Sequence, residues 1–252
     1  ELTTVKHIPK TSSLVTGDVG GNVRMWDSDS GVAGDMFGKC NGQVSSLAVS
    51  ASGKRVAAGT LHGEISVWAV QKKSLLLQVA LSDSNVLALS FGNDGKTLFV
   101  SLSRDAVVAI DIATGNELWK QKNRADVVAM EFVHSQNALL AAEATNEIQF
   151  LEVTNGTVLL VGEASGDSLR DIALFPDEKR IATLLADGTV SIWDAETLVE
   201  IASFPSSSSA DCVSVSSDGY VLSVGGGDAK IQLMDGMSRS ARLTNTNNGK
   251  SD

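Results

Sequence analysis

Short apolar segments, separated by polar turns, follow one another along the whole 252-residue chain. Within each segment, valine, isoleucine, leucine, alanine and serine succeed one another with little alternation between apolar and polar positions. That pattern is typical of β-strands that are buried on both faces. No segment shows an extended period of 3.6 residues, so the pattern predicts an all-β fold with a low helix content.

The apolar segments recur with a fixed period. Six of them align, and their last residues stand at positions 26, 68, 110, 151, 193 and 234: VRMW, ISVW, VVAI, IQFL, VSIW and IQLM. The steps between these positions are 42, 42, 41, 42 and 41 residues. A phase held over five steps identifies an internal repeat, and a period of about 40–45 residues is typical of a four-stranded β-propeller blade.

A second series of segments precedes the first and reads strand, tight turn, strand. Its turns are the pairs Pro9-Lys10, Ser52-Gly53, Asp94-Gly95, Ser135-Gln136, Asp177-Glu178 and Asp218-Gly219. Glycine accepts a positive φ, proline fixes φ, and an aspartate side chain accepts hydrogen bonds from nearby amides. Each repeat should therefore hold four strands, a to d, which in the second repeat span about 43–50, 54–60, 64–70 and 75–81.

One four-stranded sheet cannot bury both of its faces, whereas neighbouring blades cover one another. The sequence therefore predicts a β-propeller of four-stranded antiparallel blades. Six repeats are visible, over residues 2–43, 44–84, 85–125, 126–166, 167–209 and 210–243, followed by a polar tail over 244–252. Three kinds of closure stay open: a six-bladed ring, a seven-bladed ring of which one blade is missing here, or an open ring completed by a partner.

The aligned segments end in a recurring pair of an aromatic residue and an acid. Trp26-Asp27 and Trp193-Asp194 are complete Trp-Asp dipeptides, Trp68 keeps the aromatic residue and Asp235 keeps the acid. With the period, these dipeptides resemble the WD-repeat family of β-propellers over essentially the whole chain, as a divergent member. The resemblance implies structural roles for Trp26, Asp27, Trp68, Trp193, Asp194 and Asp235. The family's Gly-His dipeptide is absent, which implies that the buried Asp–His–Ser/Thr–Trp hydrogen-bond network is mostly missing.

The resemblance implies a non-enzymatic scaffold for protein–protein interactions, acting as a subunit or adaptor of a multiprotein complex. In the family, partners usually meet the face formed by the b–c turns and the d–a loops. Carried onto this chain, that rim comprises Asp18, His62, Arg104, Asp105, Asn146, Asp187 and Asp228 from b–c turns, and Asp83, Arg124, Asp126 and Asp167 from d–a loops. The rim is mostly acidic, so a basic peptide or a basic patch is the expected ligand. Asp187 and Asp228 are equally consistent with structural hydrogen bonds in their turns.

The net charge of −10 argues against nucleic acid as a direct partner, because phosphate contacts need clustered lysine and arginine. No run of 18 apolar residues exists, so no membrane span is expected. The cysteines, Cys40 and Cys212, are too far apart in sequence to form a C-x-x-C metal motif, and two cysteines are no disulfide framework. They favour a reducing compartment, cytoplasm or nucleus.

The segment WDSDSG (26–31) resembles the start of a calcium loop. Gly31 and Gly38, however, stand where such a loop needs an oxygen ligand and an acid. In register with IDIATG (110–115) and LEVTNG (151–156), the segment is instead interpreted as a repeated c–d turn, shaped by Asp27 and Gly31. Asp29 is expected to be solvated.

No catalytic, metal-binding or cofactor-binding residue is expected. His7, His62 and His134 fall in different repeats, no G-x-S-x-G occurs, and no cluster has zinc spacing. The glycine-rich GGGD (225–228) and the serine run SSSS (206–209) match no phosphate-binding motif, and we interpret them as a turn and a solvated loop.

One segment keeps an enzyme class open as the alternative function. AIDIATGNELW (109–119) resembles the A-x-D-x-x-T-G-x-x-x-W repeat of quinoprotein-type propellers, in which the motif docks one blade on the next. It occurs once, and Trp119 is expected to be an inter-blade packing residue. A quinoprotein- or lactonase-like propeller enzyme would need a cofactor or a metal in its central channel.

Overall fold

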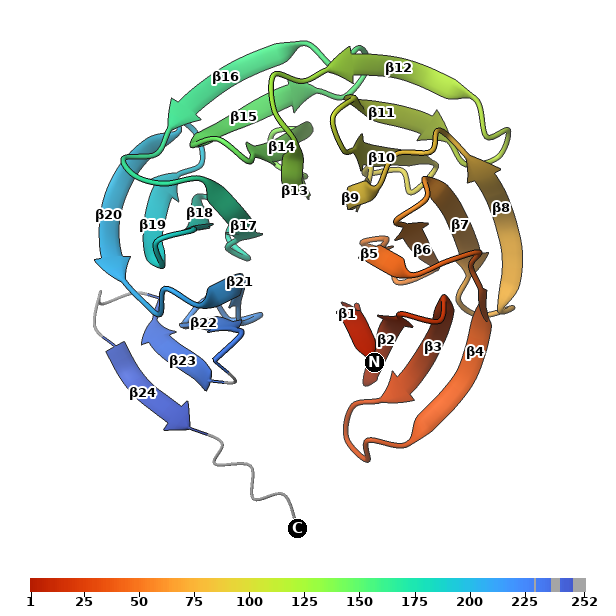
Figure 1. The fold of residues 1–252 in the computed structure, drawn as a ribbon, viewed down its shortest axis with the longest axis horizontal. Helices are drawn as coiled ribbons and strands as arrows, with labels where there is room; N and C mark the ends of the chain where they lie inside the picture. Colours follow the sequence, from red (N-terminus) through yellow and green to blue (C-terminus); the bar gives the residue numbers. More distant parts are fainter. Residues whose placement is uncertain (229, 237–240, 247–252) are drawn as a thin grey trace. The chain divides into compact units, whose positions relative to one another are not determined.

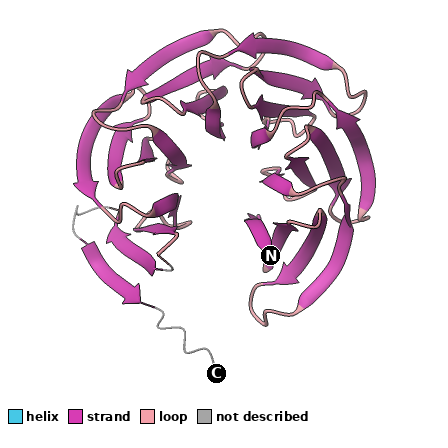
Figure 2. Cartoon of the chain, in the orientation of Figure 1, coloured by secondary structure: helices cyan, strands magenta, loops and turns pink. Residues whose placement is uncertain are grey.

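The computed structural model of the chain describes residues 1–228, 230–236 and, for the backbone, 241–246. These residues form 24 strands in six four-stranded antiparallel sheets and contain no helix (Figures 1 and 2). The fold is therefore the predicted all-β propeller of four-stranded blades. In each blade the strands pair in chain order, so that strand a is followed by b, c and d across the sheet.

The strand bounds are as follows. Blade 1 holds β1 (Leu2–Ile8), β2 (Ser13–Asp18), β3 (Asn22–Asp27) and β4 (Ala33–Lys39), and blade 2 holds β5 (Val44–Val49), β6 (Arg55–Thr60), β7 (Glu64–Ala69) and β8 (Ser74–Ala80). Blade 3 holds β9 (Val86–Phe91), β10 (Thr97–Leu102), β11 (Ala106–Asp111) and β12 (Glu117–Lys122), and blade 4 holds β13 (Val127–Val133), β14 (Ala138–Glu143), β15 (Glu147–Glu152) and β16 (Val158–Glu163). Blade 5 holds β17 (Leu169–Leu174), β18 (Arg180–Leu185), β19 (Thr189–Asp194) and β20 (Val199–Pro205), and blade 6 holds β21 (Ala210–Val215), β22 (Val221–Gly226), β23 (Lys230–Asp235) and β24 (Ala241–Thr246).

The four strands expected in the second repeat agree with β5 to β8 to within one residue at each end. The last strand, β24, continues to residue 246 and therefore extends three residues into the segment expected to be a polar tail. Residues 247–252 of that segment lie outside the described residues.

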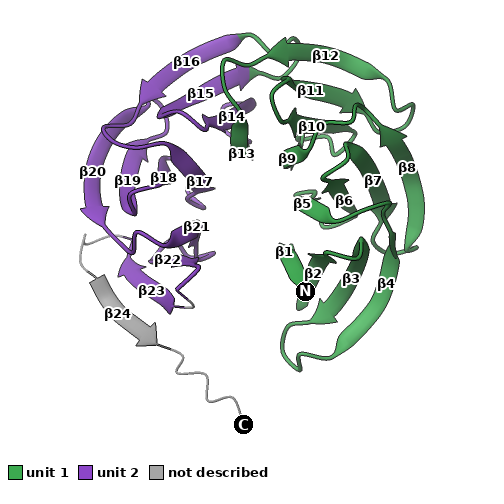
Figure 3. Cartoon of the chain, in the orientation of Figure 1, with its two compact units in different colours: residues 1–132, 152–157 green, residues 133–151, 158–252 purple. Residues whose placement is uncertain are grey.

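The chain divides into two compact units (Figure 3). The first comprises residues 1–132 and 152–157, and the second comprises residues 133–151 and 158–252. Blades 1 to 3 lie wholly in the first unit, and blades 5 and 6 lie in the second. The closure of the ring stays a prediction.

The a–b hairpins turn where the sequence predicts them. A positive φ is found at Lys10, Gly53, Gly95, Glu178 and Gly219. In blade 4 the residue with positive φ is Asn137, at 48°, whose amide donates to the carbonyl of His134. That turn is therefore centred one residue later than the predicted Ser135-Gln136 pair, because asparagine tolerates the left-handed region better than glutamine.

The c–d turns share one construction. The acid at the end of strand c accepts a hydrogen bond from the amide three residues later, at 2.8 Å for Asp27, 2.8 Å for Asp111 and 2.9 Å for Asp194. The residue four positions after the end of strand c has a positive φ in five blades: Gly31, Lys73, Gly115, Gly156 and Leu198. In blade 2 the strand ends in Ala69 instead of an acid. WDSDSG is thus a turn shaped by Asp27 and Gly31, as predicted, and Asp29 is exposed.

These turn acids make stability depend on pH. Hydroxyl hydrogen bonds from Ser30, Thr114 and Thr197 hold the pKa of Asp27, Asp111 and Asp194, respectively, below the ordinary aspartate value. A depressed folded-state pKa contributes stability that is present above the unfolded pKa and is lost as pH falls through the folded pKa. We therefore expect the thermal midpoint to fall between about pH 5 and 3, and to fall less in a D27N/D111N/D194N variant.

Thermal unfolding followed by circular dichroism across that pH range checks this prediction. D29N is the matched control, because Asp29 lies exposed in the same turn as Asp27 and should leave the pH profile of the wild type unchanged. A triple variant with the same decline as the wild type would contradict the assignment.

Neighbouring blades are joined by a repeated contact beside strand a. Thr3 Oγ1 donates to the carbonyl of Val44 at 2.7 Å, and Ser45 Oγ donates to the carbonyl of Val86 at 2.6 Å. Gly59 lies against the Val86 side chain so closely that a Cβ would overlap it. Apolar residues of blades 2 and 3 then close into one buried cluster around Val86.

In two blades the tryptophan of strand c donates a hydrogen bond to a threonine hydroxyl of strand b. Trp26 Nε1 donates to Thr16 Oγ1 at 2.8 Å, and Trp193 Nε1 donates to Thr183 Oγ1 at 3.0 Å. The threonine stands ten residues before the tryptophan in both cases. Trp68 is buried, as Trp193 is, but Ala58 holds the position corresponding to the threonine and offers no hydroxyl. The network expected to be mostly missing is therefore present as a Thr–Trp pair in blades 1 and 5.

Trp119 docks strand β12 on the c–d turn of blade 4. Its Nε1 donates to the carbonyl of Val153 at 2.8 Å, and its ring lies flush against Gly156, where a Cβ would be 2.6 Å from the Cε3 atom. Phe99 packs beside it, with ring centroids 5.7 Å apart. The inter-blade packing role predicted for Trp119 is confirmed.

Candidate functional site

The b–c turns and the d–a loops lie at the same end of the strands and are joined by backbone hydrogen bonds. Cys40 N donates to Gly21 O at 2.8 Å, and Ser206 N donates to Gly188 O at 2.8 Å. We call this end of the blades the loop edge. It comprises b–c turns 18–21, 60–63, 102–105, 143–146, 185–188 and 226–228, and d–a loops 40–43, 81–85, 123–126, 164–168 and 206–209.

Two predicted rim acids of the first unit hold loop backbone: Asp18 holds its own b–c turn, and Asp126 holds the b–c turn beside its d–a loop. Asp18 Oδ1 accepts hydrogen bonds from the amides of Gly20 and Asn22, at 2.9 and 2.8 Å. Asp126 accepts hydrogen bonds from Ser103 Oγ, at 3.0 Å, and from the Arg104 amide. Hydrogen bonding by the Asn22 side chain lowers the pKa of Asp18, so this carboxylate stays ionised at neutral pH.

The other rim residues of the first unit differ in whether their side chains have partners within the described part of the chain. Asp105 forms an ion pair with Lys120, with 2.7 Å between Oδ2 and Nζ. His62 lies beside Gly42, where a Cβ would be 2.9 Å from the imidazole Cδ2. Asp83 and Arg124 are exposed, and neither side chain makes a hydrogen bond or ion pair within the part of the chain that is described. The Arg104 side chain is exposed too.

The second unit contributes four predicted residues, and its turns use most of them. Asn146 Nδ2 donates to the Ala164 carbonyl at 3.0 Å, and Asp187 Oδ1 accepts from the Thr189 amide at 2.7 Å. Asp167 is exposed and accepts only from the amide of the next residue.

Asp228 holds both its own turn and the neighbouring d–a loop. It accepts hydrogen bonds from the Lys230 amide at 3.1 Å and from Ser207 Oγ at 3.0 Å, and these lower its pKa. For Asp187 and Asp228 the structure therefore shows the turn bonds that the sequence left as one of two options.

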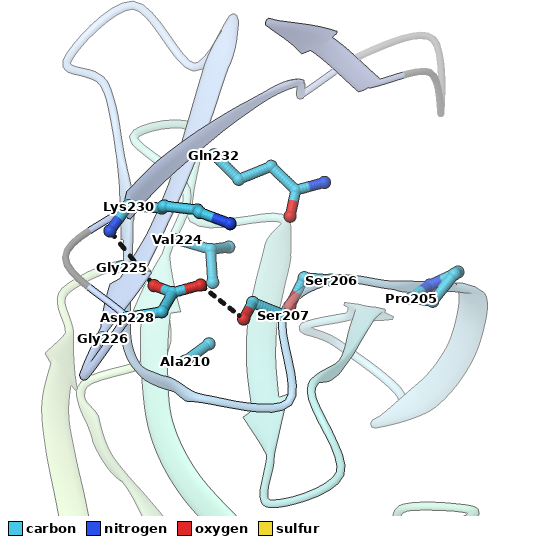
Figure 4. A pocket seen from close by; sticks show the side chains of 10 residues that line it. All are labelled: Pro205, Ser206, Ser207, Ala210, Val224, Gly225, Gly226, Asp228, Lys230 and Gln232. Atoms are coloured by element: carbon cyan, nitrogen blue, oxygen red, sulfur yellow. Dashed lines mark hydrogen bonds between the residues drawn. The ribbon is translucent and has the colours of Figure 1, made fainter. Parts of the chain in front are cut away.

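A pocket of about 340 Å³ opens beside Asp228 (Figure 4). Its walls come from the d–a loop after β20 and from β21, β22 and β23: Pro205, Ser206, Ser207, Ala210, Val224, Gly225, Gly226, Asp228, Lys230 and Gln232. We did not predict this pocket from the sequence. The sequence held one signal for it. SSSS and GGGD, which we interpreted separately as a loop and a turn, both lie at the loop edge, one before and one after strand β21.

Titratable side chains do not gather elsewhere into a reactive group. Across the described residues, no three His, Cys, Asp or Glu side chains are placed to share a metal ion. His134 Nδ1 faces Glu178 Oε1 at 3.1 Å in the a–b hairpins, whereas His62 is at the loop edge of its own unit. Both cysteines are free thiols, and burial raises the pKa of Cys40 to about 11. No described helix could cross a membrane.

The repeated four-stranded blades define a β-propeller, and comparison with known proteins identifies its family. The family model described as outer membrane protein assembly factor BamB matches residues 20–197, more than half of the chain, and the chain belongs to this family. It is also similar to transcription factor unc-37 of Caenorhabditis elegans, a WD-repeat protein, with 30% identity over 100 residues. That match covers 39% of this chain and 16% of the relative. The propeller is thus shown, whereas its WD-repeat character rests on the partial match.

Proposed function

We propose that the chain is a non-enzymatic propeller scaffold that binds a protein partner at its loop edge, within a multiprotein complex. The observation that carries the proposal is that some charged residues of the loop edge hold its backbone while others are exposed and unpaired within the described part of the chain. Asp18 and Asp126 fix the loop backbones, while Asp83 and Arg124 stay exposed with free side chains. Charged groups on loops held by a rigid scaffold are the usual arrangement of a binding surface.

The comparisons support this proposal indirectly. The family description names an assembly factor for outer membrane proteins, and the relative is named a transcription factor. Neither description names a reaction. Both fit a chain that works by holding other macromolecules. The predicted location in cytoplasm or nucleus stays a prediction.

A basic peptide or basic patch is the proposed ligand of the loop edge. Within the first unit, hydrogen bonds keep Asp18 ionised, and Asp83 adds an exposed carboxylate. Reversing Asp18 or Asp126 would disturb the loop backbone that each one holds, so these residues are poor probes of binding. Asp83 is the better probe because its side chain has no structural partner among the described residues.

We expect D83K to weaken binding of a fluorescent lysine-rich octapeptide several-fold, since a rim charge acts mainly through electrostatic attraction. Fluorescence anisotropy at low salt measures the affinity. D29K is the matched control: it makes the same change in net charge at an exposed c–d turn, at the opposite end of the strands. Equal weakening by D83K and D29K would show that only the total charge matters and would contradict a loop-edge site.

The alternative function is a quinoprotein- or lactonase-like enzyme. The docking of Trp119 on Gly156 favours it, because this motif is what resembles the quinoprotein repeat, and the family match fits it as well. An absorbance scan and metal analysis of protein purified from its source cell discriminate between the two functions. A stoichiometric chromophore or metal would support the enzyme and contradict the scaffold.

A further inference from the structure

The pocket beside Asp228 has a size and a wall chemistry that suit a small polar group. Its volume of about 340 Å³ falls at the lower end of the range of small-molecule sites, about 300–1,000 Å³. Val224 and Ala210 form an apolar floor. In Figure 4 the Lys230 side chain extends across the pocket, and the Gln232 amide turns its oxygen toward the Ser206–Ser207 loop and its nitrogen away from that loop.

Blade 4 shows what the corresponding place holds in a sister repeat. Counted back from the last aligned position of strand c, Glu143 corresponds to Gly226, and Gln149 corresponds to Gln232. In blade 4, Gln149 Nε2 donates to Glu143 Oε1 at 3.0 Å, and both side chains are buried. In blade 4, therefore, the glutamine side-chain amide donates its hydrogen bond to a carboxylate of the same sheet.

Blade 6 keeps the glutamine but has lost the internal carboxylate. A Cβ at Gly226 would overlap the Ser209 carbonyl oxygen, so the backbone admits no side chain there. The Gln232 amide makes no hydrogen bond to any described residue, and the same holds for the Lys230 ammonium. Lys230 also stands where blade 4 has Glu147, so a negative charge is replaced by a positive one.

We propose that this pocket binds a carboxylate supplied by a ligand, which takes the place that Glu143 occupies in blade 4. With its amide group rotated by half a turn from the orientation in Figure 4, Gln232 would donate to one oxygen, and the Lys230 ammonium would supply charge and a second donor. Ser206 and Ser207 already donate to the Gly188 carbonyl and to Asp228, so they add no donor.

The neighbouring Asp228 limits the affinity, because its ionised carboxylate repels an anionic ligand and already interacts with the Lys230 charge. A single carboxylate should therefore bind on the order of millimolar. This inference goes beyond the loop-edge docking of a basic partner and does not depend on it.

The test is a titration of the full chain followed by ¹H–¹⁵N nuclear magnetic resonance at constant ionic strength. Three probes distinguish the source of the carboxylate: N-acetylglutamate N-methylamide for an acidic side chain, N-acetylleucine for a chain terminus, and inorganic phosphate for any anion. N-acetylglutamine N-methylamide is the neutral isostere. We expect at least one carboxylate probe to shift the Gln232 side-chain and Gly225 amide signals saturably. The isostere should bind about tenfold more weakly or worse.

Variants assign the donors. K230Q and Q232L should each weaken binding of that probe about tenfold or more. K179Q should not, since Lys179 is exposed in the a–b hairpin of blade 5, at the other end of the strands. A wild-type spectrum elsewhere in each variant shows that the fold is kept. Binding of the isostere or of phosphate as tight as that of both carboxylate probes would overturn the proposal, and so would undiminished binding by folded K230Q and Q232L.

Discussion

Replacing Trp193 by alanine is expected to lower the free energy of unfolding by about 3–5 kcal/mol, the range found for large-to-small changes of a buried tryptophan. Trp193 is 1% exposed and is the largest of the fully buried side chains. Its removal leaves a cavity in blade 5 and also deprives Thr183 of its hydrogen-bond donor. Urea denaturation followed by circular dichroism measures the change.

Two further variants separate packing from hydrogen bonding. W26A removes a tryptophan with the same threonine bond, but Trp26 is only half-buried, so its loss should be clearly smaller. T183V keeps the shape and leaves the Trp193 N–H unpaired, at a cost of about 1–3 kcal/mol. A loss at W193A no larger than at W26A would mean that burial does not set the effect.

The second large effect concerns the glycine on which Trp119 packs. We expect G156A to destabilise the protein by about 2–5 kcal/mol, combining about 1–2 kcal/mol for the left-handed φ of 75° with about 1–3 kcal/mol for overpacking against the indole ring. Gly31 occupies the same turn position in blade 1, with φ 68° and nothing within 4 Å of a Cβ. G31A should therefore cost only the backbone part.

The difference between the two glycine variants isolates the docking of Trp119. In a W119L background that difference should shrink, because leucine is the residue that blade 2 uses at this position: Leu77, 3.1 Å from a Cβ at Gly115. Denaturant unfolding of the four proteins provides the comparison. Equal losses of unfolding free energy for G156A and G31A in the wild-type background would show that the Trp119 ring moves aside at no cost and is not tightly packed on residue 156.

Much of the fold could be predicted from the sequence because each blade repeats the same local rules. The period fixed the number of strands, and the turn residues fixed their ends to within a residue in blade 2. The a–b turn of blade 4 was misplaced by one residue because three polar residues, Ser135, Gln136 and Asn137, compete for one left-handed position. Local propensity ranks such candidates only weakly.

The candidate site could be predicted less well than the fold. The rim residues lie at the b–c turns and d–a loops, but turn topology could not say which of their carboxylates already accept hydrogen bonds within the chain. Asp126 holds the Arg104 amide from a loop 22 residues away, a contact that no local pattern encodes. The pocket of blade 6 was missed for a related reason, since it depends on what two adjacent loops leave unfilled.

The backbone around Gly226 also limits how this blade can change by mutation. Because any side chain at 226 would meet the Ser209 carbonyl, no single substitution there can rebuild the internal Glu–Gln pair of blade 4. Point mutations at the other wall positions can alter the charge of the pocket, but they leave position 226 without a side chain. Sequence drift in blade 6 would therefore tend to change which ligand the pocket accepts before it filled the pocket.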